Sequence, residues 1–186
     1  METNITQDIT VFTIGHSTHT SDKFMGLLKQ FGIRTLVDVR SIPYSRRAPQ
    51  YNLPVLSQRL EEENILYIYA GSQLGGFPNY PAVYRSGKVP ESRADFTREI
   101  NYEAAEQQEW YQEGIKRLIE AAREQPTAVM CAEEDPAHCH RQHLIAQTLI
   151  DEGIRVMHIR ADISLQTAWK EDRQAKGSHP DQPPLY

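Results

Sequence analysis

The sequence predicts an α/β fold, a single three-layer domain with a mainly parallel sheet of about five strands flanked by helices. Short apolar segments rich in β-branched residues alternate with segments of helical periodicity along the chain. The apolar segments are hydrophobic nearly throughout, as in strands that are buried on both faces. Strict alternation of strand and helix indicates βαβ units with right-handed crossovers. The length of 186 residues suits one domain of this kind.

Strands and helices follow one another in order from residue 10. Five strands are expected, at residues 10–15, 33–39, 65–70, 127–132 and 154–159. Thr20 or Ser21 can cap a first helix, which Gly32 is placed to end. Pro54 suits the first position of a second helix. Apolar periodicity then predicts a long helix over roughly 96–124, and a last helix precedes the fifth strand.

Two connections, at 40–53 and 71–95, are longer than βαβ units need. Long loops at the carboxyl edge of a parallel sheet usually build the functional site. We expect the domain to cover residues 1–173. Residues 174–186, which contain three prolines, are expected to form a C-terminal tail.

Composition excludes several classes of protein. The formal net charge of −5 argues against a general nucleic-acid or membrane-surface coat, although a local basic site remains compatible with it. No apolar run reaches the length of a membrane span, and the amino terminus shows no secretory signal. Two cysteines do not suit a disulfide-stapled scaffold. These features predict a cytoplasmic protein without membrane contact, and they leave its oligomeric state open.

The segment from Cys131 to Arg141, CAEEDPAHCHR, is the densest cluster of reactive side chains. If Asp135 caps the following helix, Cys139 lies within its first two turns. The field at the helix start and the nearby Arg141 would then lower the pKa of the Cys139 thiol and make it nucleophilic. Cys131 ends a buried strand, where an inert core cysteine is the alternative.

Other polar residues are predicted at the same edge of the sheet, where ligands of open parallel sheets bind. Candidate acid–base groups are His16, Glu133 and His140. Candidate anion-binding residues are Ser17, Asp38, Arg40 and Arg141. Asp38 and Arg40 share a strand face, so they can form a pair that presents a guanidinium to the substrate or a purely structural salt bridge.

A metal centre is the competing interpretation of the Cys/His cluster. The possible ligands for Zn or Fe are Cys131, Cys139, His138, His140 and Glu133. The set that we select adds His143 and consists of Cys131, Cys139, His138 and His143. Cys139 and His143 are four residues apart, which places both on one face of a helix. However, the chain has no CxxC pair, and the spacing matches no common structural zinc pattern.

The loop after the second predicted strand is basic within an acidic chain. Arg46 and Arg47 are interleaved with Tyr44 and Tyr51, a composition that suits phosphate binding and base stacking. The alternative is a solvated loop whose arginines pair with the acidic run at 61–63.

The segments TIGHS, LVDVRSIPYSR, LGG and CAEEDPAHCHR together resemble the DUF488 family, a domain of unknown function. The resemblance runs from about Val11 to Ile163, and it implies that the strand-end segments are the family's defining motifs. VDVR followed later by a Cys and an Arg is also distantly similar to the rhodanese pattern of sulfur transferases. Rhodaneses and Cys-dependent phosphatases place several residues between these two, whereas one residue separates Cys139 from Arg141, so neither activity is carried over.

The sequence therefore predicts an enzyme, a Cys-dependent transferase or hydrolase, that acts on an anionic substrate. A phosphate-bearing small molecule, a nucleotide or a nucleic-acid fragment fits this chemistry. Cys139 would be its nucleophile or a metal ligand. The alternatives are a metal-binding protein and a non-enzymatic nucleic-acid-binding module that uses Arg46, Arg47, Tyr44 and Tyr51.

Overall fold

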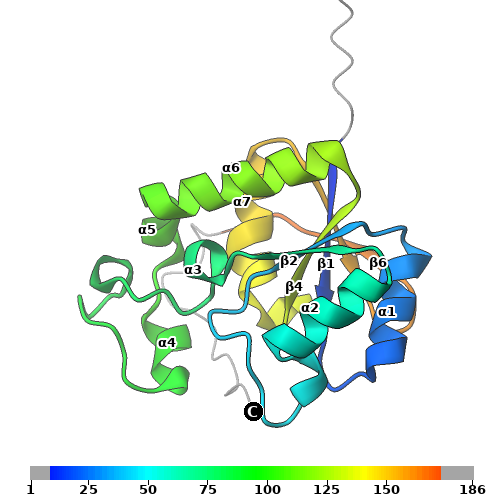
Figure 1. Ribbon diagram of the computed structural model, residues 1–186. Coiled ribbons are helices and arrows are strands. Elements are labelled where there is room, and N and C mark those ends of the chain that lie inside the picture. Colours follow the sequence, from blue (N-terminus) through cyan, green and yellow to red (C-terminus); the bar gives the residue numbers. More distant parts are fainter. Residues whose placement is uncertain (1–8, 173–186) are drawn as a thin grey trace, which may run out of the picture.

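The structure, a computed structural model, describes residues 9–172. One sheet runs through its centre in the order β3-β2-β4-β1-β5-β6 (Figure 1). All pairs are parallel except β5 with β6. The strands are β1 (Thr10–Gly15), β2 (Thr35–Asp38), β3 (Leu66–Tyr69), β4 (Thr127–Cys131), β5 (Arg155–Ile159) and β6 (Leu165–Thr167). The predicted α/β fold with a mainly parallel sheet is confirmed, and β6 is an addition that periodicity did not indicate.

Helices cover both faces of this sheet. On one face lie α1 (Ser21–Gln30) and α2 (Leu53–Glu62), and on the other lie α6 (Glu109–Glu124) and α7 (Gln147–Asp151) (Figure 1). The remaining short helices are α3 (Gly71–Leu74), α4 (Arg93–Glu99), α5 (Tyr102–Glu106), three 3₁₀ turns at Pro49–Tyr51, Pro81–Val83 and Pro136–His138, and a π-helix at Arg141–Ala146. Among the described residues, no helix is long and apolar enough to cross a membrane.

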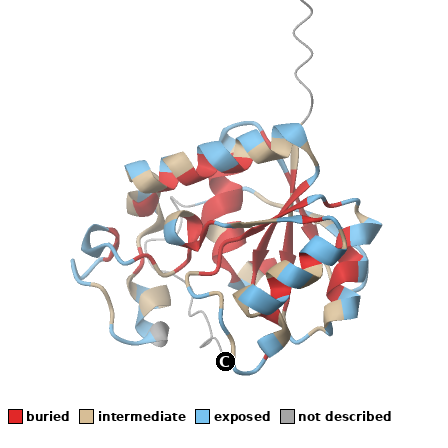
Figure 2. Ribbon diagram, in the orientation of Figure 1, coloured by how far each residue is buried: buried red, intermediate tan, exposed pale blue. Residues whose placement is uncertain are grey.

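Two apolar clusters, one on each side of the sheet, form the core. Phe24 and Leu28 of α1 and Leu60 of α2 pack against Ile14 and Met130 on one face. Figure 2 shows that the central strands β1, β2, β4 and β5 are mostly buried, whereas the edge strands β3 and β6 contain no buried residue. The residues expected to begin and end α1 do so. The Thr20 hydroxyl accepts a hydrogen bond from the Lys23 amide at the start, and Gly32 follows the end with a φ of +65°, which favours glycine.

The long helix predicted over 96–124 is wrong, because the chain breaks twice within it. Ile100 is extended and forms an antiparallel bridge with Tyr84, which ends α4. Asn101 then caps α5 by accepting from the Ala104 amide at 3.1 Å, and an extended Gln108 precedes α6. Apolar periodicity continued across these breaks because Ile100 is buried in the same core cluster as the α6 residues.

The helix predicted to contain Cys139 is also wrong. Asp135 does cap the segment, accepting from the Ala137 amide at 2.9 Å, but only a single 3₁₀ turn follows. Cys139 is then extended (φ −135°, ψ 140°), and the next helix begins at Arg141 as a π-helix that runs into α7. π-helices are rare and often lie at functional sites. Cys139 therefore lies between two helices.

The strand order creates a crevice at the carboxyl ends of β1, β2 and β4. The connections that follow β1 and β2 run over the α1/α2 face, whereas β4, which lies between these strands, continues into α7 on the opposite face. Ligands bind at such a divergence in open α/β sheets. The tail predicted at 174–186 lies outside the described residues.

Candidate functional site

A cavity of about 640 Å³ opens at this edge of the sheet. All four candidate catalytic residues line it, and so do four of the candidate anion-binding residues. The lining residues are His16, Arg40, Ser41, Ile42, Tyr44, Ser45, Arg46, Arg47, Gly76, Phe77, Thr97, Tyr102, Cys131, Ala132, Glu133, His138, Cys139 and His140.

Cys131, Cys139 and His140 meet on the wall of this cavity. His140 Nδ1 lies 3.7 Å from Cys131 Sγ and 3.8 Å from Cys139 Sγ. The other ring nitrogen, Nε2, lies 3.1 Å from the Leu74 carbonyl oxygen. Because a carbonyl only accepts, Nε2 carries the proton in the neutral ring, and the lone pair of Nδ1 points toward both sulfurs.

The two thiols differ in their acidity. Burial alone would raise the pKa of Cys139, but the hydrogen bond from Cys131 and the charge of Arg141 lower it well below its usual range. The same hydrogen bond, together with burial, raises the pKa of Cys131 well above its usual range. Cys139 is therefore the more acidic of the two thiols, and its role as the activated cysteine stays a prediction.

Arg141 lies beneath the cavity and does not contribute to its wall. The side chain is 0% exposed, and Nη2 donates to the carbonyls of Glu133 at 2.6 Å and Glu134 at 2.8 Å. Nη1 donates to Thr13 Oγ1 at 2.8 Å, and Nε has no partner among the described residues. Arg141 thus holds the loop after β4 and stabilises the thiolate, but it is too buried to contact an anion in the cavity as the sequence predicted.

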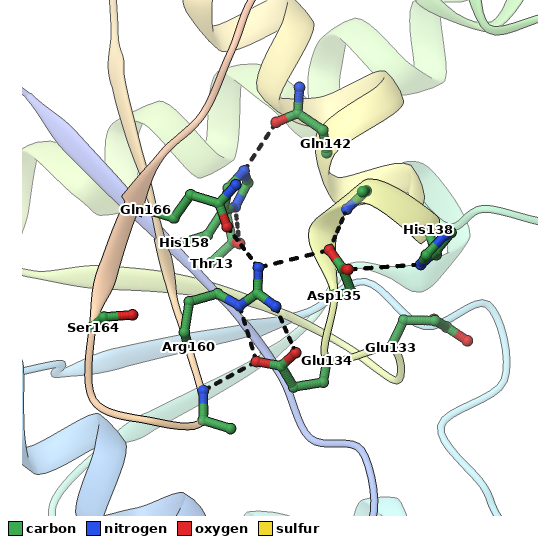
Figure 3. A network of polar contacts seen from close by, with 12 residues as sticks. Thr13, Glu133, Glu134, Asp135, His138, Gln142, His158, Arg160, Ser164 and Gln166 are labelled. Carbon is green, nitrogen blue, oxygen red and sulfur yellow. Dashed lines mark hydrogen bonds and ion pairs between the residues drawn. The ribbon is translucent and has the colours of Figure 1, made fainter.

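A chain of buried hydrogen bonds continues from Arg141, and Figure 3 shows its part from Thr13 through His158 to Gln142. Thr13 Oγ1 accepts from Arg141, so its hydroxyl donates to His158 Nδ1 at 2.7 Å. His158 Nε2 then donates to Gln142 Oε1 at 2.9 Å. Burial and the charge of Arg141 lower the pKa of His158 to about 3, so this ring is neutral.

Asp38 and Arg40 form a buried pair at the end of β2. Arg40 Nε and Nη2 donate to the two carboxylate oxygens at 2.9 and 2.6 Å, and Nη2 also donates to the Tyr51 carbonyl at 2.7 Å. Asp38 in addition accepts from the Tyr67 hydroxyl at 2.8 Å. The structure shows the salt bridge, and the guanidinium also lines the cavity, while its contact with a substrate stays a prediction.

His16 and Ser17 hold the end of β1. The Ser17 amide donates to the Ala132 carbonyl at 2.8 Å, and its own carbonyl accepts from His16 Nδ1 at 2.8 Å, so Ser17 serves the turn and not the cavity wall. His16 Nε2 then faces Arg40 Nη1 at 3.3 Å. Burial lowers the pKa of His16 to about 4. The neutral ring accepts a hydrogen bond from Arg40 through its Nε2 lone pair and so positions the guanidinium.

The family model for DUF488, a domain of unknown function, matches residues 20–148. The chain belongs to the DUF488 family. No curated protein and no solved structure matches it in the other two comparisons. The matched range contains Asp38, Arg40 and the whole segment from Cys131 to Arg141. The distant similarity to rhodaneses finds no support in these comparisons.

The basic loop of this DUF488 protein lies at the mouth of the cavity. Arg46 and Arg47 are exposed, and neither forms an ion pair with another described residue. The acidic run at 61–63 instead pairs with Arg59 and Lys29. Tyr44 is 59% exposed, but Tyr51 is 0% exposed in the core beneath His16, so its ring cannot stack on a base.

The four metal ligands proposed from the sequence do not meet in the structure. Among the described residues, the group whose ligand atoms all lie within 4.8 Å of one another is Cys131, Cys139 and His140. His143 directs Nδ1 at Glu171 (2.5 Å) and Nε2 at the Ala137 carbonyl (2.7 Å). The helical spacing of Cys139 and His143 does not apply because Cys139 lies outside the helix. His138 lines the cavity but is half exposed beside Asp135.

Tyr102 and Gly76 contribute to the wall and were not among the candidate site residues. Tyr102, which opens α5, lines the cavity, and burial and the nearby Cys139 raise its pKa. Gly76 packs against His140, so that a Cβ there would lie 2.9 Å from His140 Nδ1. The glycine pair after β3 was the only signal for Gly76, and nothing local marks Tyr102.

Proposed function

We propose that this DUF488 protein is an enzyme that acts on an anionic, phosphate-bearing substrate in the cavity. One observation carries the proposal. The cavity joins a Cys/His/Glu set on one wall with two arginines at its mouth that form no ion pair with any other described residue. Cys131 and Cys139 form no disulfide, which is typical of proteins in a reducing compartment and supports the cytoplasmic location expected from the sequence.

The arginines of the cavity have different tasks. Arg46 and Arg47 keep their full charge for the substrate, and guanidinium groups bind phosphate in a bidentate manner. Arg40 is neutralised by Asp38, and one N–H of its Nη1 remains without a partner among the described residues. Arg40 can therefore orient a substrate oxygen deep in the cavity, while Arg46 and Arg47 supply most of the attraction.

The reactive groups lie on the opposite wall. The Cys139 thiolate is a nucleophile or a metal ligand, and both roles require the deprotonated sulfur. Burial and the nearby Cys139 raise the pKa of Glu133, which makes this carboxyl a candidate proton donor or acceptor. Figure 3 shows the Glu133 side chain directed away from the Arg160 network, and Glu133 lines the cavity.

Anion binding tests the first part of the proposal. Calorimetry with inorganic phosphate, pyrophosphate and nucleoside mono- and diphosphates should detect binding at low salt. The double variant Arg46→Ala/Arg47→Ala should weaken this binding at least about tenfold, since each charge-assisted contact contributes about 1.5–3 kcal/mol. The matched control Lys116→Ala/Arg123→Ala removes the same charge from the exposed face of α6 and should bind as the wild type does.

Turnover tests the second part. Chromogenic phosphate mono- and diesters should be cleaved by the wild type and not by Cys139→Ser, while phosphate binding persists in that variant. An equal loss of phosphate binding in the α6 control would show that binding depends only on the net charge of the protein. This result would contradict phosphate binding in the cavity. Binding without turnover of any ester, equal in wild type and Cys139→Ser, would contradict the enzymatic part.

A non-enzymatic nucleic-acid-binding module is the second candidate. The exposed Tyr44 beside Arg46 and Arg47 favours it, because exposed aromatic and guanidinium groups together bind single strands. This function predicts binding of a single-stranded oligonucleotide that falls steeply with salt and is unchanged by Cys139→Ser. Absence of oligonucleotide binding even at low salt would exclude it.

A further inference from the structure

We propose that Cys131, Cys139 and His140 bind one divalent thiophilic cation, with Zn²⁺ as the first candidate, and leave one coordination position open toward the cavity. The inference deepens the proposed function, because the cation would lie on the reactive wall of the same cavity. Of the possible ligands that the sequence offered, this set keeps Cys131, Cys139 and His140 and leaves out His138 and His143.

The separations of the three ligand atoms fit a tetrahedral ion. Zn–S bonds of about 2.3 Å and Zn–N bonds of about 2.0–2.1 Å place sulfur and nitrogen about 3.6 Å apart at the tetrahedral angle. The observed separations from His140 Nδ1 are 3.7 Å to Cys131 Sγ and 3.8 Å to Cys139 Sγ. All three atoms lie within 4.8 Å of one another. Binding thus requires little movement of the side chains.

The histidine is oriented in the way that metal-bound histidines are. Its Nε2 donates to the Leu74 carbonyl at 3.1 Å, which leaves the Nδ1 lone pair directed at the sulfurs. Metal-ligating histidines almost always donate their second ring N–H to a carboxylate, a backbone carbonyl or water. This contact joins two segments that are 66 residues apart, so the ring orientation is a property of the fold and not of the local sequence.

A glycine keeps the space beside this nitrogen free. At Gly76 a Cβ would lie 2.9 Å from His140 Nδ1 and 3.0 Å from its Cγ. Real Cβ atoms essentially never approach so closely, so any larger residue would displace the ring from its present place. The close approach of the backbone at Gly76 therefore preserves the position of the nitrogen that would bind the ion.

The charges around the cluster also suit a bound cation. Binding displaces the proton of Cys131, so that two thiolates and a neutral imidazole balance the charge of a divalent ion. Glu133 Oε2 lies 3.6 Å from Cys131 Sγ on the cavity side. Three protein ligands with one open position are typical of catalytic zinc, which acts as a Lewis acid on a bound oxygen.

Cobalt(II) binding tests the site directly. Protein purified without chelator or metal-affinity steps and kept reduced should bind one Co²⁺ per chain, with a thiolate-to-cobalt charge-transfer band and the intense visible bands of tetrahedral cobalt. Stoichiometric Zn²⁺ should displace the Co²⁺ and abolish both spectral features. The variant His140→Ala should weaken binding at least about tenfold, as expected for loss of one ligand. His138→Ala is the matched control, because this half-exposed imidazole is two residues away and should bind cobalt as the wild type does.

A second variant avoids the risk that a ligand variant does not fold. Gly76→Ala retains all three ligands and adds one methyl group beside Nδ1, so it should weaken cobalt binding while circular dichroism stays unchanged. Absence of the charge-transfer band in wild type would overturn the inference, and so would equal cobalt binding in wild type, His140→Ala and Gly76→Ala. The variant Arg46→Ala/Arg47→Ala should retain the metal, so failure of the metal site and failure of anion binding are distinguished.

Discussion

Two buried arginines follow the neighbouring strands β2 and β4, and their surroundings differ. Arg40, 6% exposed, is held by both carboxylate oxygens of Asp38, by a carbonyl and by His16. Arg141, 0% exposed, is held by two carbonyls and the Thr13 hydroxyl, and none of these partners carries a charge. The first arginine belongs to a neutral pair, whereas the second retains its charge inside the protein.

The two arginines therefore have different effects at this edge of the sheet. The Arg40 charge is balanced by Asp38, whereas the Arg141 charge acts on the nearby thiols. A buried ion without a counter-ion costs several kcal/mol, so it persists only where something nearby offsets it. The Cys139 thiolate is the anion whose pKa Arg141 lowers. Arg40 orders the β2 end, while Arg141 favours the deprotonated sulfur that both nucleophilic and metal chemistry require.

Breaking the neutral pair should have the largest effect on stability. Asp38→Asn leaves the Arg40 charge buried without its partner, and we expect a loss of about 3–5 kcal/mol in the free energy of unfolding. Urea denaturation measures it. The control Asp22→Asn, which removes a carboxylate that is 92% exposed, should change stability by less than about 0.5 kcal/mol. Equal effects at Asp38 and Asp22 would contradict the neutral-pair description.

Removing the uncompensated charge should cost less and should change the thiol. Arg141→Met leaves the Glu133 and Glu134 carbonyls without their donor, a loss of about 2–6 kcal/mol at about 1–3 kcal/mol for each unsatisfied group. Removal of a buried charge that has no carboxylate partner offsets part of this loss. The pKa of Cys139 should rise, which slows its alkylation at neutral pH in the metal-free protein. Arg141→Lys keeps the charge and should preserve more of the reactivity than of the stability. Unchanged alkylation in Arg141→Met would show that Arg141 is purely structural.

Much of this fold follows from local patterns, because buried parallel strands are short apolar runs. Residues 10–15 were expected as a strand and form β1 with the same bounds, and the start of α1 follows from Thr20. The predicted helix over 96–124 failed because apolar periodicity does not record a break. The bridge from Ile100 to Tyr84 and the Asn101 cap interrupt the helix without interrupting the buried side.

The location of the site was predictable, but its internal pairing was not. Parallel strands end at one edge of a sheet, so His16, Arg40, Cys131 and Cys139 could be expected together. The choice of His140 over His143 depends on an extended Cys139 and on the Leu74 carbonyl, which are both outcomes of tertiary folding. Arg141 was expected to bind an anion, but it is buried beneath the loop after β4, where it donates to Thr13 of β1.

Acid should lower the free energy of unfolding through His158, which lies near the Arg141 charge. The pKa of His158 is lowered from 6.5 to about 3, so between these values the unfolded chain binds a proton that the folded chain does not. The stability that neutral His158 contributes is fully present above about pH 6.5 and is lost as the pH falls toward 3. Between pH 6.5 and 5 the loss is about 2 kcal/mol, at about 1.36 kcal/mol per unit.

His158→Gln is the variant that isolates this loss. It removes the titration, so its free energy of unfolding should depend less on pH by that amount, even though the variant is less stable at pH 7. His16, whose pKa is lowered to about 4, titrates in both proteins and cancels in the comparison. Parallel pH profiles would show that His158 is not neutral in the folded protein.

A third arginine, Arg160, forms a partly exposed ion pair with Glu134 on the solvent side of the loop after β4. This pair shows how much an exposed arginine contributes in comparison with the two buried ones. Arg160 donates to both carboxylate oxygens of Glu134 at 3.0 and 2.8 Å (Figure 3). Arg141 donates to the backbone carbonyl of that same residue from the buried side. The Arg160 and Glu134 side chains are 24% and 26% exposed, so solvent screens their attraction. A double-mutant cycle with Glu134→Gln and Arg160→Gln should give a coupling energy of about 1 kcal/mol that falls with salt. A coupling energy that does not depend on salt and is as large as the effect of Arg141→Met would show that the Arg160–Glu134 pair stabilises this loop as much as Arg141 does. Burial would then not explain the difference between Arg40 and Arg141.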